Sequence, residues 1–182
     1  MEVKGVINIV NKVLTYDTTV EKEKRYKIST ESFRDAVSNG EIKIYDAVKI
    51  EQVWFGKSDK YTARVRKTIK EFNFKGVREI IYEHTVKHHI SPTMDYEVTT
   101  DLTERDYELL RKLYKDENCQ IKLRFYVRAI DGSDENYIAT VDMPYDEPGI
   151  CWVEFELKNA NVNNSDDNKN VFVKPDWVKV IR

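Results

Sequence analysis

The sequence has few cysteines, no long apolar run and almost no net charge. Its two cysteines, Cys119 and Cys151, lack metal-site spacing, so we expect reduced thiols in a cytoplasmic protein. No apolar run approaches the ~18 residues of a membrane span, and the first residues lack the apolar stretch of a signal peptide. We therefore expect no membrane partner. A formal net charge of -2 gives no overall attraction to duplex nucleic acid. Glycine-rich phosphate loops and nucleophile motifs are also absent.

The chain's 182 residues fit one domain, which we place at residues 18–182, with residues 1–17 as an extension that packs on it. Apolar spacing in residues 3–14 fits one helix face, but its β-branched residues make a strand nearly as plausible. A short helix that ends at Ser38 is predicted, with Ser29 or Thr30 as its cap, and a second helix over 104–115 with Thr103 as cap. Strands are predicted near residues 18–28, 41–54, 60–68, 79–89, 94–100, 120–129, 136–143 and 150–158. Leu110 and Leu113 are expected to continue the buried face of the second helix, and residues 159–170 read as a polar loop.

What the sequence does contain is charge at alternate positions of its strands. Neighbouring alternate residues of a strand share a face. Basic pairs fall in the middle of the chain at Arg64 and Arg66 and at Lys122 and Arg124, and Lys87 lies two residues after Thr85. A β-sandwich with one solvated face is the simple interpretation. The restriction to Arg, Lys and Glu favours instead a closed barrel with a polar lumen, cations on one wall and carboxylates on the other.

Acidic pairs lie near both ends of the chain. Glu21 and Glu23 form one Glu-x-Glu pair, and Glu154 and Glu156 form the other. Two carboxylates side by side repel each other, and a divalent cation between them removes that repulsion. Carboxylate oxygens are the ligands that Mg²⁺ and Mn²⁺ prefer. The predicted metal ligands are therefore these four glutamates, with Asp142 as a further candidate.

In this order, the segments resemble the CYTH superfamily, also called triphosphate tunnel metalloenzymes. The resemblance covers about residues 20–178 and rests on eight short motifs in sequence, none specific by itself. They are Glu21-Lys-Glu23-Lys-Arg25, Gln52-Val-Trp54, Arg64-Val-Arg66, Thr85-Val-Lys87, Asp95-Tyr-Glu97, Lys122-Leu-Arg124-Phe-Tyr126, Thr140-Val-Asp142 with Glu154-Phe-Glu156, and Pro175-Asp-Trp177.

The resemblance implies an eight-stranded antiparallel tunnel, mainly β with a few flanking helices and a charged lumen. It implies an enzyme that hydrolyses a linear triphosphate, inorganic or organic, with Mg²⁺ or Mn²⁺. The phosphate ligands would be Arg25, Arg64, Arg66, Lys87, Lys122 and Arg124. The catalytic group would comprise Glu21, Glu23, Arg25 and Asp142. A monomer or homodimer acting on a small-molecule triphosphate is expected.

Arg25 departs from the family pattern, which has Lys at this position. An arginine does not act as a base. Two alternatives therefore remain open: a class IV-type adenylyl cyclase, and a non-catalytic protein that binds nucleotides or polyphosphate. His84, His88 and His89 could suggest a metal site, but exposed histidines at a strand end are the simpler interpretation. Trp54, Trp152 and Tyr126 could stack on a base.

Overall fold

The computed structural model describes residues 3–9, 12–72, 77–92, 94–114, 119–130, 137–157 and 174–181. Side chains are described from residue 23 onward, apart from those of residues 57, 71–72, 77, 137–138 and 157. The elements in these ranges are β1 (Val3–Ile9), β2 (Lys12–Ser29), α1 (Thr30–Ser38), β3 (Ile42–Lys57), β4 (Tyr61–Phe72), β5 (Val77–Ser91), β6 (Met94–Asp101), α2 (Glu104–Leu113), β7 (Cys119–Ala129), β8 (Tyr137–Pro144) and β9 (Ile150–Leu157).

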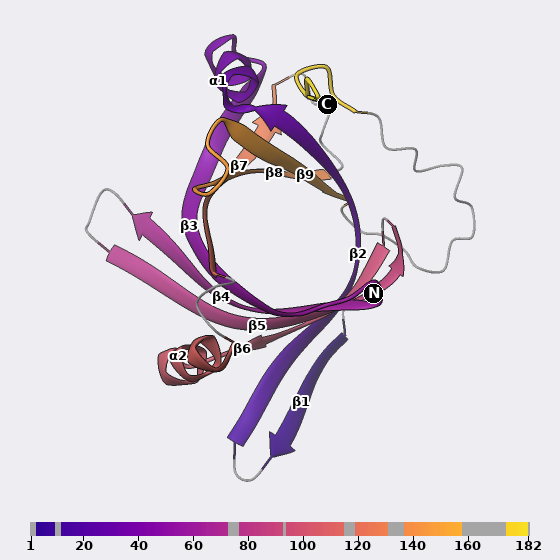
Figure 1. Ribbon diagram of the computed structural model, residues 1–182, viewed down its shortest axis with the longest axis vertical. Helices are drawn as coiled ribbons and strands as arrows, with labels where there is room; N and C mark the ends of the chain where they lie inside the picture. The colour runs from indigo at the N-terminus through magenta and orange to yellow at the C-terminus, as the bar shows by residue number, and fades with distance from the viewer. Residues whose placement is uncertain are drawn as a thin grey trace. The chain divides into compact units, whose positions relative to one another are not determined.

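The strands follow the hydrogen-bonded order β1-β2-β6-β5-β4-β3-β7-β8-β9, and β2 also pairs with β9 (Figure 1). The described registers of β1–β2, β2–β9, β4–β5, β5–β6, β7–β8 and β8–β9 are antiparallel. The strands β2 to β9 therefore form a cycle of hydrogen-bonded neighbours, and β1 is added to β2 as a hairpin. The predicted fold class, mainly β with eight antiparallel strands and a few helices, is confirmed. For residues 3–9 and 12–14, the described part of the segment 3–14, the strand alternative is correct and the helix alternative is wrong.

The chain divides into two compact units. Unit 1 contains Met1–Glu21 and Lys49–Ile121, and unit 2 contains Lys22–Val48 and Lys122–Arg182. No helix in the described part of the chain is long and apolar enough to span a membrane. Cys119 and Cys151 are both free thiols.

Unit 2 has a hydrophobic core on one face of its strands. Val127, Val141, Val153 and Phe155 are buried on that face, and Phe33 of α1 packs against them. Of the two predicted caps, Ser29 is the one that caps α1, by accepting a hydrogen bond from the backbone N–H of Ser32 at 3.0 Å. The Pro175-Asp-Trp177 segment contains a turn. Its Trp177 is buried against Phe155, with 5.9 Å between ring centroids.

Unit 1 has its own core, beneath α2. Thr103 caps α2 by accepting from the backbone N–H of Asp106 at 3.1 Å, as predicted. Tyr107 is fully buried with Val53 and Val65, and Leu110 packs against them. The prediction that Leu113 is buried is wrong, because its side chain is 72% exposed. Only the stripe of α2 that faces β4 and β5 is covered, and Leu113 lies outside it.

A half-buried histidine joins this core and makes unit 1 sensitive to pH. His84 stacks on Phe55 at 5.3 Å, and Phe55 stacks on Tyr114 at the end of α2 at 3.8 Å. Burial lowers the pKa of His84 below its ordinary value of 6.5. The unfolded state therefore takes up a proton more readily than the folded state, and stability falls as pH drops through 6.5.

We expect the melting temperature of the native chain to fall between pH 7.5 and pH 5, and to fall less in His84→Phe. Phenylalanine keeps the stacking and removes the titrating group. The exposed His88 provides the matched control, since His88→Phe makes the same substitution at an exposed position outside this core. If His84→Phe and the native chain lose stability in parallel, His84 does not set this slope.

Candidate functional site

The charged face of unit 2 lies opposite its hydrophobic core. Because side chains alternate along a strand, burial of Val127, Val141 and Val153 in the core sends the intervening residues to the other face. Register brings them into rows. Arg124 of β7 is opposite Asp142 of β8, and Arg25 of β2 is opposite Glu154 of β9.

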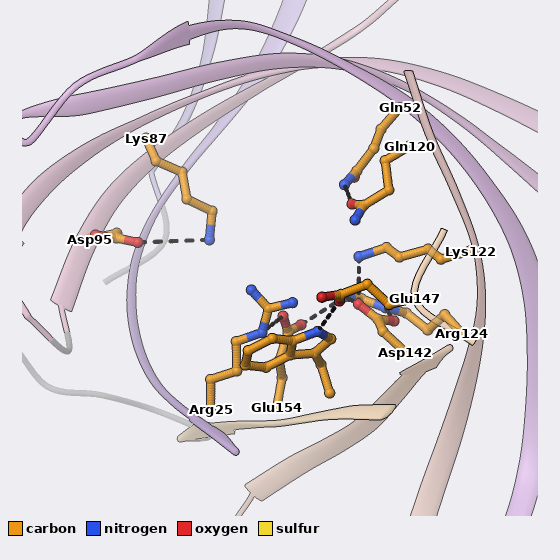
Figure 2. A network of polar contacts seen from close by, with 11 residues as sticks. Arg25, Gln52, Lys87, Asp95, Gln120, Lys122, Arg124, Asp142, Glu147 and Glu154 are labelled. Atoms are coloured by element: carbon orange, nitrogen blue, oxygen red, sulfur yellow. Dashed lines mark hydrogen bonds and ion pairs between the residues drawn. The ribbon is translucent and has the colours of Figure 1, made fainter. Parts of the chain in front are cut away.

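These side chains form one ion-paired network, here called the Asp142 cluster: Arg25, Lys122, Arg124, Asp142 and Glu154 (Figure 2). Asp142 is fully buried and accepts hydrogen bonds from Lys122 Nζ, and from Arg124 Nε and Nη2 at 2.7 Å each. Arg124 Nη2 also donates to Glu154 Oε2 at 2.7 Å. The other oxygen of Glu154 lies 3.2 Å from Arg25 Nε.

Pairing controls the charge states in this cluster. Burial by itself would raise the pKa of Asp142, but the bonds and charges of Arg124 and Lys122 bring it well below its ordinary value. Burial would lower the pKa of Arg124, but Asp142 and Glu154 raise it. Burial would also raise the pKa of Glu154, and the charge of Arg124 instead lowers it. All three groups are therefore ionised at neutral pH.

The charge layout differs from the prediction of cations and carboxylates on separate walls. Lys122 and Arg124 contact Asp142 and Glu154 directly, because β7, β8 and β9 are neighbours in the sheet. The cluster holds three cations and two carboxylates. The third cation, Arg25, is the most exposed member of the cluster, with a side chain 46% exposed.

The second Glu-x-Glu pair extends this face toward β2. Glu23 and Glu156 are directly opposite each other in the β2–β9 register, and both are partly buried. Like charges at opposed positions are unfavourable, and a divalent cation would reduce that cost. The side chain of Glu21 lies outside the described residues. Among the side chains that are described, no three His, Cys, Asp or Glu converge on one point. The oxygen ligands of Glu23, Glu154 and Glu156 nevertheless suit Mg²⁺ or Mn²⁺ in kind.

Trp152 borders the Asp142 cluster. The Arg25 guanidinium carbon lies 4.4 Å from the centroid of the Trp152 ring, and Lys27 Nζ lies 5.5 Å from it. The indole Nε1 donates to Glu147 Oε2 at 2.9 Å (Figure 2). Stacking on an aromatic face orients a guanidinium better than it orients an ammonium group. The face of Trp152 is therefore matched to arginine at position 25.

Unit 1 contains a separate group, the Lys87 cluster: Lys87, His89, Asp95, Glu97 and Thr99. Lys87 Nζ lies 3.0 Å from Glu97 Oε2. It also lies 3.9 Å from Asp95 Oδ2, a contact drawn in Figure 2. His89 Nδ1 lies 2.7 Å from Asp95 Oδ1. Burial would raise the pKa of Glu97, and the charges of Lys87 and Arg64 lower it. These groups share one face of β5 and β6.

Arg64 and Arg66 lie on β4 of the same unit and are both partly buried. The Arg64 guanidinium carbon lies 5.2 Å from the Trp54 ring centroid, and in the register Arg64 is opposite Thr85. Gln52, from the motif that precedes Trp54, is buried and donates from Nε2 to Gln120 Oε1 at 2.8 Å.

The structure thus places the predicted site residues in two groups. Arg25, Lys122, Arg124, Asp142 and Glu154 meet in unit 2, and Lys87 and Arg64 belong to unit 1. The histidines do not share one site: His84 packs in the core, His88 is exposed and His89 contacts Asp95. Sequence reasoning missed Glu147 and Gln120, because neither belongs to an alternating charged pair. Asp95 and Glu97 belong to one of the eight motifs but were not predicted as site residues.

No protein-family model and no curated protein matches this sequence. The fold is similar to solved structures of archaeal proteins. The PH1012 protein of Pyrococcus horikoshii OT3 is 18% identical, with a TM-score of 0.55 over 78% of this chain and 80% of that chain. The PH1819 protein of the same organism is 17% identical, with a TM-score of 0.53 over 77% and 80%. A conserved hypothetical protein of Pyrococcus furiosus is 18% identical, with a TM-score of 0.53 over 75% and 78%. At these identities the similarity establishes the fold alone.

Proposed function

We propose that this protein is a divalent-metal-dependent hydrolase of a linear triphosphate, of the triphosphate tunnel type. One observation carries the proposal: an ion-paired cluster of three cations and two carboxylates, buried apart from the more exposed Arg25, on the face of the sheet opposite the core. Burying charge is costly unless it is paired, and the more exposed Arg25 is the cation in excess of the cluster's carboxylates that an anion could contact. The ordered motifs of the sequence indicate which anion.

The cluster's contacts suggest how the groups would act. Arg124, Lys122 and Arg25 would donate to phosphate oxygens, where arginine offers two parallel donors and lysine a point charge. Each now contacts a carboxylate, so a phosphate that takes these donors would release oxygens of Asp142 and Glu154. Those oxygens, with Glu21, Glu23 and Glu156, would then hold Mg²⁺ or Mn²⁺. The metal would neutralise charge that develops on the phosphoryl group.

A second candidate is a protein that binds triphosphate without hydrolysing it. It is favoured by Arg25, which contacts Glu154 and stacks on Trp152. An arginine held in this way binds an anion well but cannot accept a proton from water. The two free thiols suit a reducing compartment, so we expect either activity in the cytoplasm.

The reaction is tested by measuring phosphate, pyrophosphate and cyclic AMP released from inorganic triphosphate, ATP and thiamine triphosphate, with Mg²⁺ or Mn²⁺. Release of phosphate supports the hydrolase. Cyclic AMP with pyrophosphate from ATP would mean a cyclase instead. Binding without any product would leave the non-catalytic protein as the function.

Binding itself is predicted to depend on Arg124. Loss of its charge-assisted contacts in Arg124→Ala should weaken inorganic triphosphate binding by about ten- to a hundredfold in isothermal titration. Lys112→Ala is the control, because Lys112 is an exposed cation on α2. Lys87, Arg64 and Arg66 remain predicted phosphate ligands, and Lys87→Ala in the same titration tests them. Equal effects of Arg124→Ala and Lys112→Ala would exclude the Asp142 cluster as the anion site.

A further inference from the structure

Beyond the buried charges, unit 2 carries an exposed aromatic group: Tyr45 of β3 with Tyr126 and Arg128 of β7, here called the tyrosine platform. The two tyrosine rings have centroids 6.1 Å apart at an interplanar angle of 45°. The Arg128 guanidinium carbon lies 5.1 Å from the Tyr45 ring centroid. Tyr45 is 51% exposed, and Arg128 is also exposed. The planar groups of these three side chains therefore lie together at the surface of unit 2.

The tyrosine platform lies on the same face of the sheet as the Asp142 cluster. Phe125 and Val127 of β7 pack in the hydrophobic core, so Tyr126 and Arg128 point to the face that also carries Arg124. Ile44 of β3 packs on that core as well, which sends Tyr45 to the opposite face. The cations and the aromatic rings therefore belong to one continuous surface of unit 2.

Burial decreases along β7 in the order that an elongated ligand would require. Lys122 is 4% exposed, the Arg124 side chain is 14% exposed, Tyr126 is partly buried and Arg128 is exposed. Residues two apart on a strand are separated by about 6.5–7 Å. That spacing lets one small molecule place phosphates against Lys122 and Arg124 and a ring against Tyr126.

We propose that the tyrosine platform binds a planar aromatic group, so that the ligand of the Asp142 cluster is a triphosphate ester that carries an aromatic ring rather than inorganic triphosphate. The inference rests on the proposed function, since it takes the Asp142 cluster to be the phosphate site. Aromatic rings stack on tyrosine, and the arginine guanidinium adds a cation–π surface. A chain that needed only inorganic triphosphate would gain nothing from exposed tyrosines beside its cations.

The test compares ATP with methyl triphosphate, which carries the same triphosphate ester and no ring. Titrations in EDTA separate binding from turnover. We expect ATP to bind about 5- to 150-fold more tightly than methyl triphosphate, the range expected for base–aromatic stacking. Tyr126→Leu and Tyr45→Ser should bring this ratio toward one while leaving the affinity for methyl triphosphate unchanged. Tyr61→Ser is the matched control, because Tyr61 of β4 is 50% exposed and lies in unit 1.

Each outcome decides between the inference and the function beneath it. If the native chain binds ATP and methyl triphosphate with equal affinity, the tyrosine platform does not bind the ring, and the triphosphate site is unaffected. This measurement needs no variant. A high ratio that survives both tyrosine substitutions places the ring elsewhere and overturns the inference. If Tyr61→Ser lowers the affinity ratio as much as the two platform substitutions do, the effect is not specific to the tyrosine platform and the inference is also overturned. If neither ligand binds the native chain, either in EDTA or with Mg²⁺ added, the proposed function fails together with the inference.

Discussion

Asp142→Asn should lower the free energy of unfolding by about 3–5 kcal/mol, the cost expected when one partner of a buried ion pair is removed. Asp142 is fully buried and neutralises both Lys122 and Arg124. Asparagine keeps the size of the side chain but leaves those two cations under-compensated. Urea denaturation measures the change, with Asp146→Asn in the exposed turn after β8 as the control.

The same variant should be rescued by an anion. Inorganic triphosphate should raise the melting temperature of Asp142→Asn more than that of the native chain, because it replaces the missing negative charge at Lys122 and Arg124.

Asp142 should also make the stability of the native chain depend on pH in acid. Its pKa is lowered by folding, so its contribution is present above the unfolded pKa, near 3.8, and is lost as pH falls below it. If Asp142→Asn lowers the free energy of unfolding by less than about 1 kcal/mol, as expected at an exposed ion pair, the result would contradict a buried network.

Glu154→Gln should reduce metal-dependent triphosphate turnover by about a hundredfold or more, the loss typical when a group that stabilises transition-state charge is removed. Glu154 belongs both to the Asp142 cluster and to a Glu-x-Glu pair. In the proposed function its carboxylate therefore contacts both Arg124 and the metal ion. Glutamine keeps one oxygen but loses the charge. Initial rates at saturating Mg²⁺ or Mn²⁺ measure the effect.

The controls for this prediction separate a metal ligand from a structural ion pair. Glu31→Gln changes an exposed acid of α1 and should leave the rate unchanged. Excess chelator should abolish turnover in the native chain. Full activity in chelator would exclude metal dependence, and a native rate in Glu154→Gln would remove Glu154 from the site.

Local sequence determined much of the fold. The capping residues Ser29 and Thr103 set the starts of α1 and α2 because each side chain accepts a hydrogen bond from the backbone N–H three residues later. Alternation along β7 and β9 fixed which residues share a face, since the period of two is a property of the strand alone. These features need no knowledge of the neighbouring chain segments, and they predicted the core and charged faces of unit 2 correctly.

Only the tertiary structure decided which charges meet. Arg124 contacts Asp142 and Arg25 contacts Glu154 because strand neighbours and register bring together residues that are distant in sequence. The sequence placed cations and carboxylates on separate walls, since it shows the charge of each strand but not its partner. Tyr45 and Tyr126 likewise become one platform only through the packing of β3 beside β7. Alternation is local, whereas strand pairing is chosen by the burial of the whole core, and that choice assembled the site.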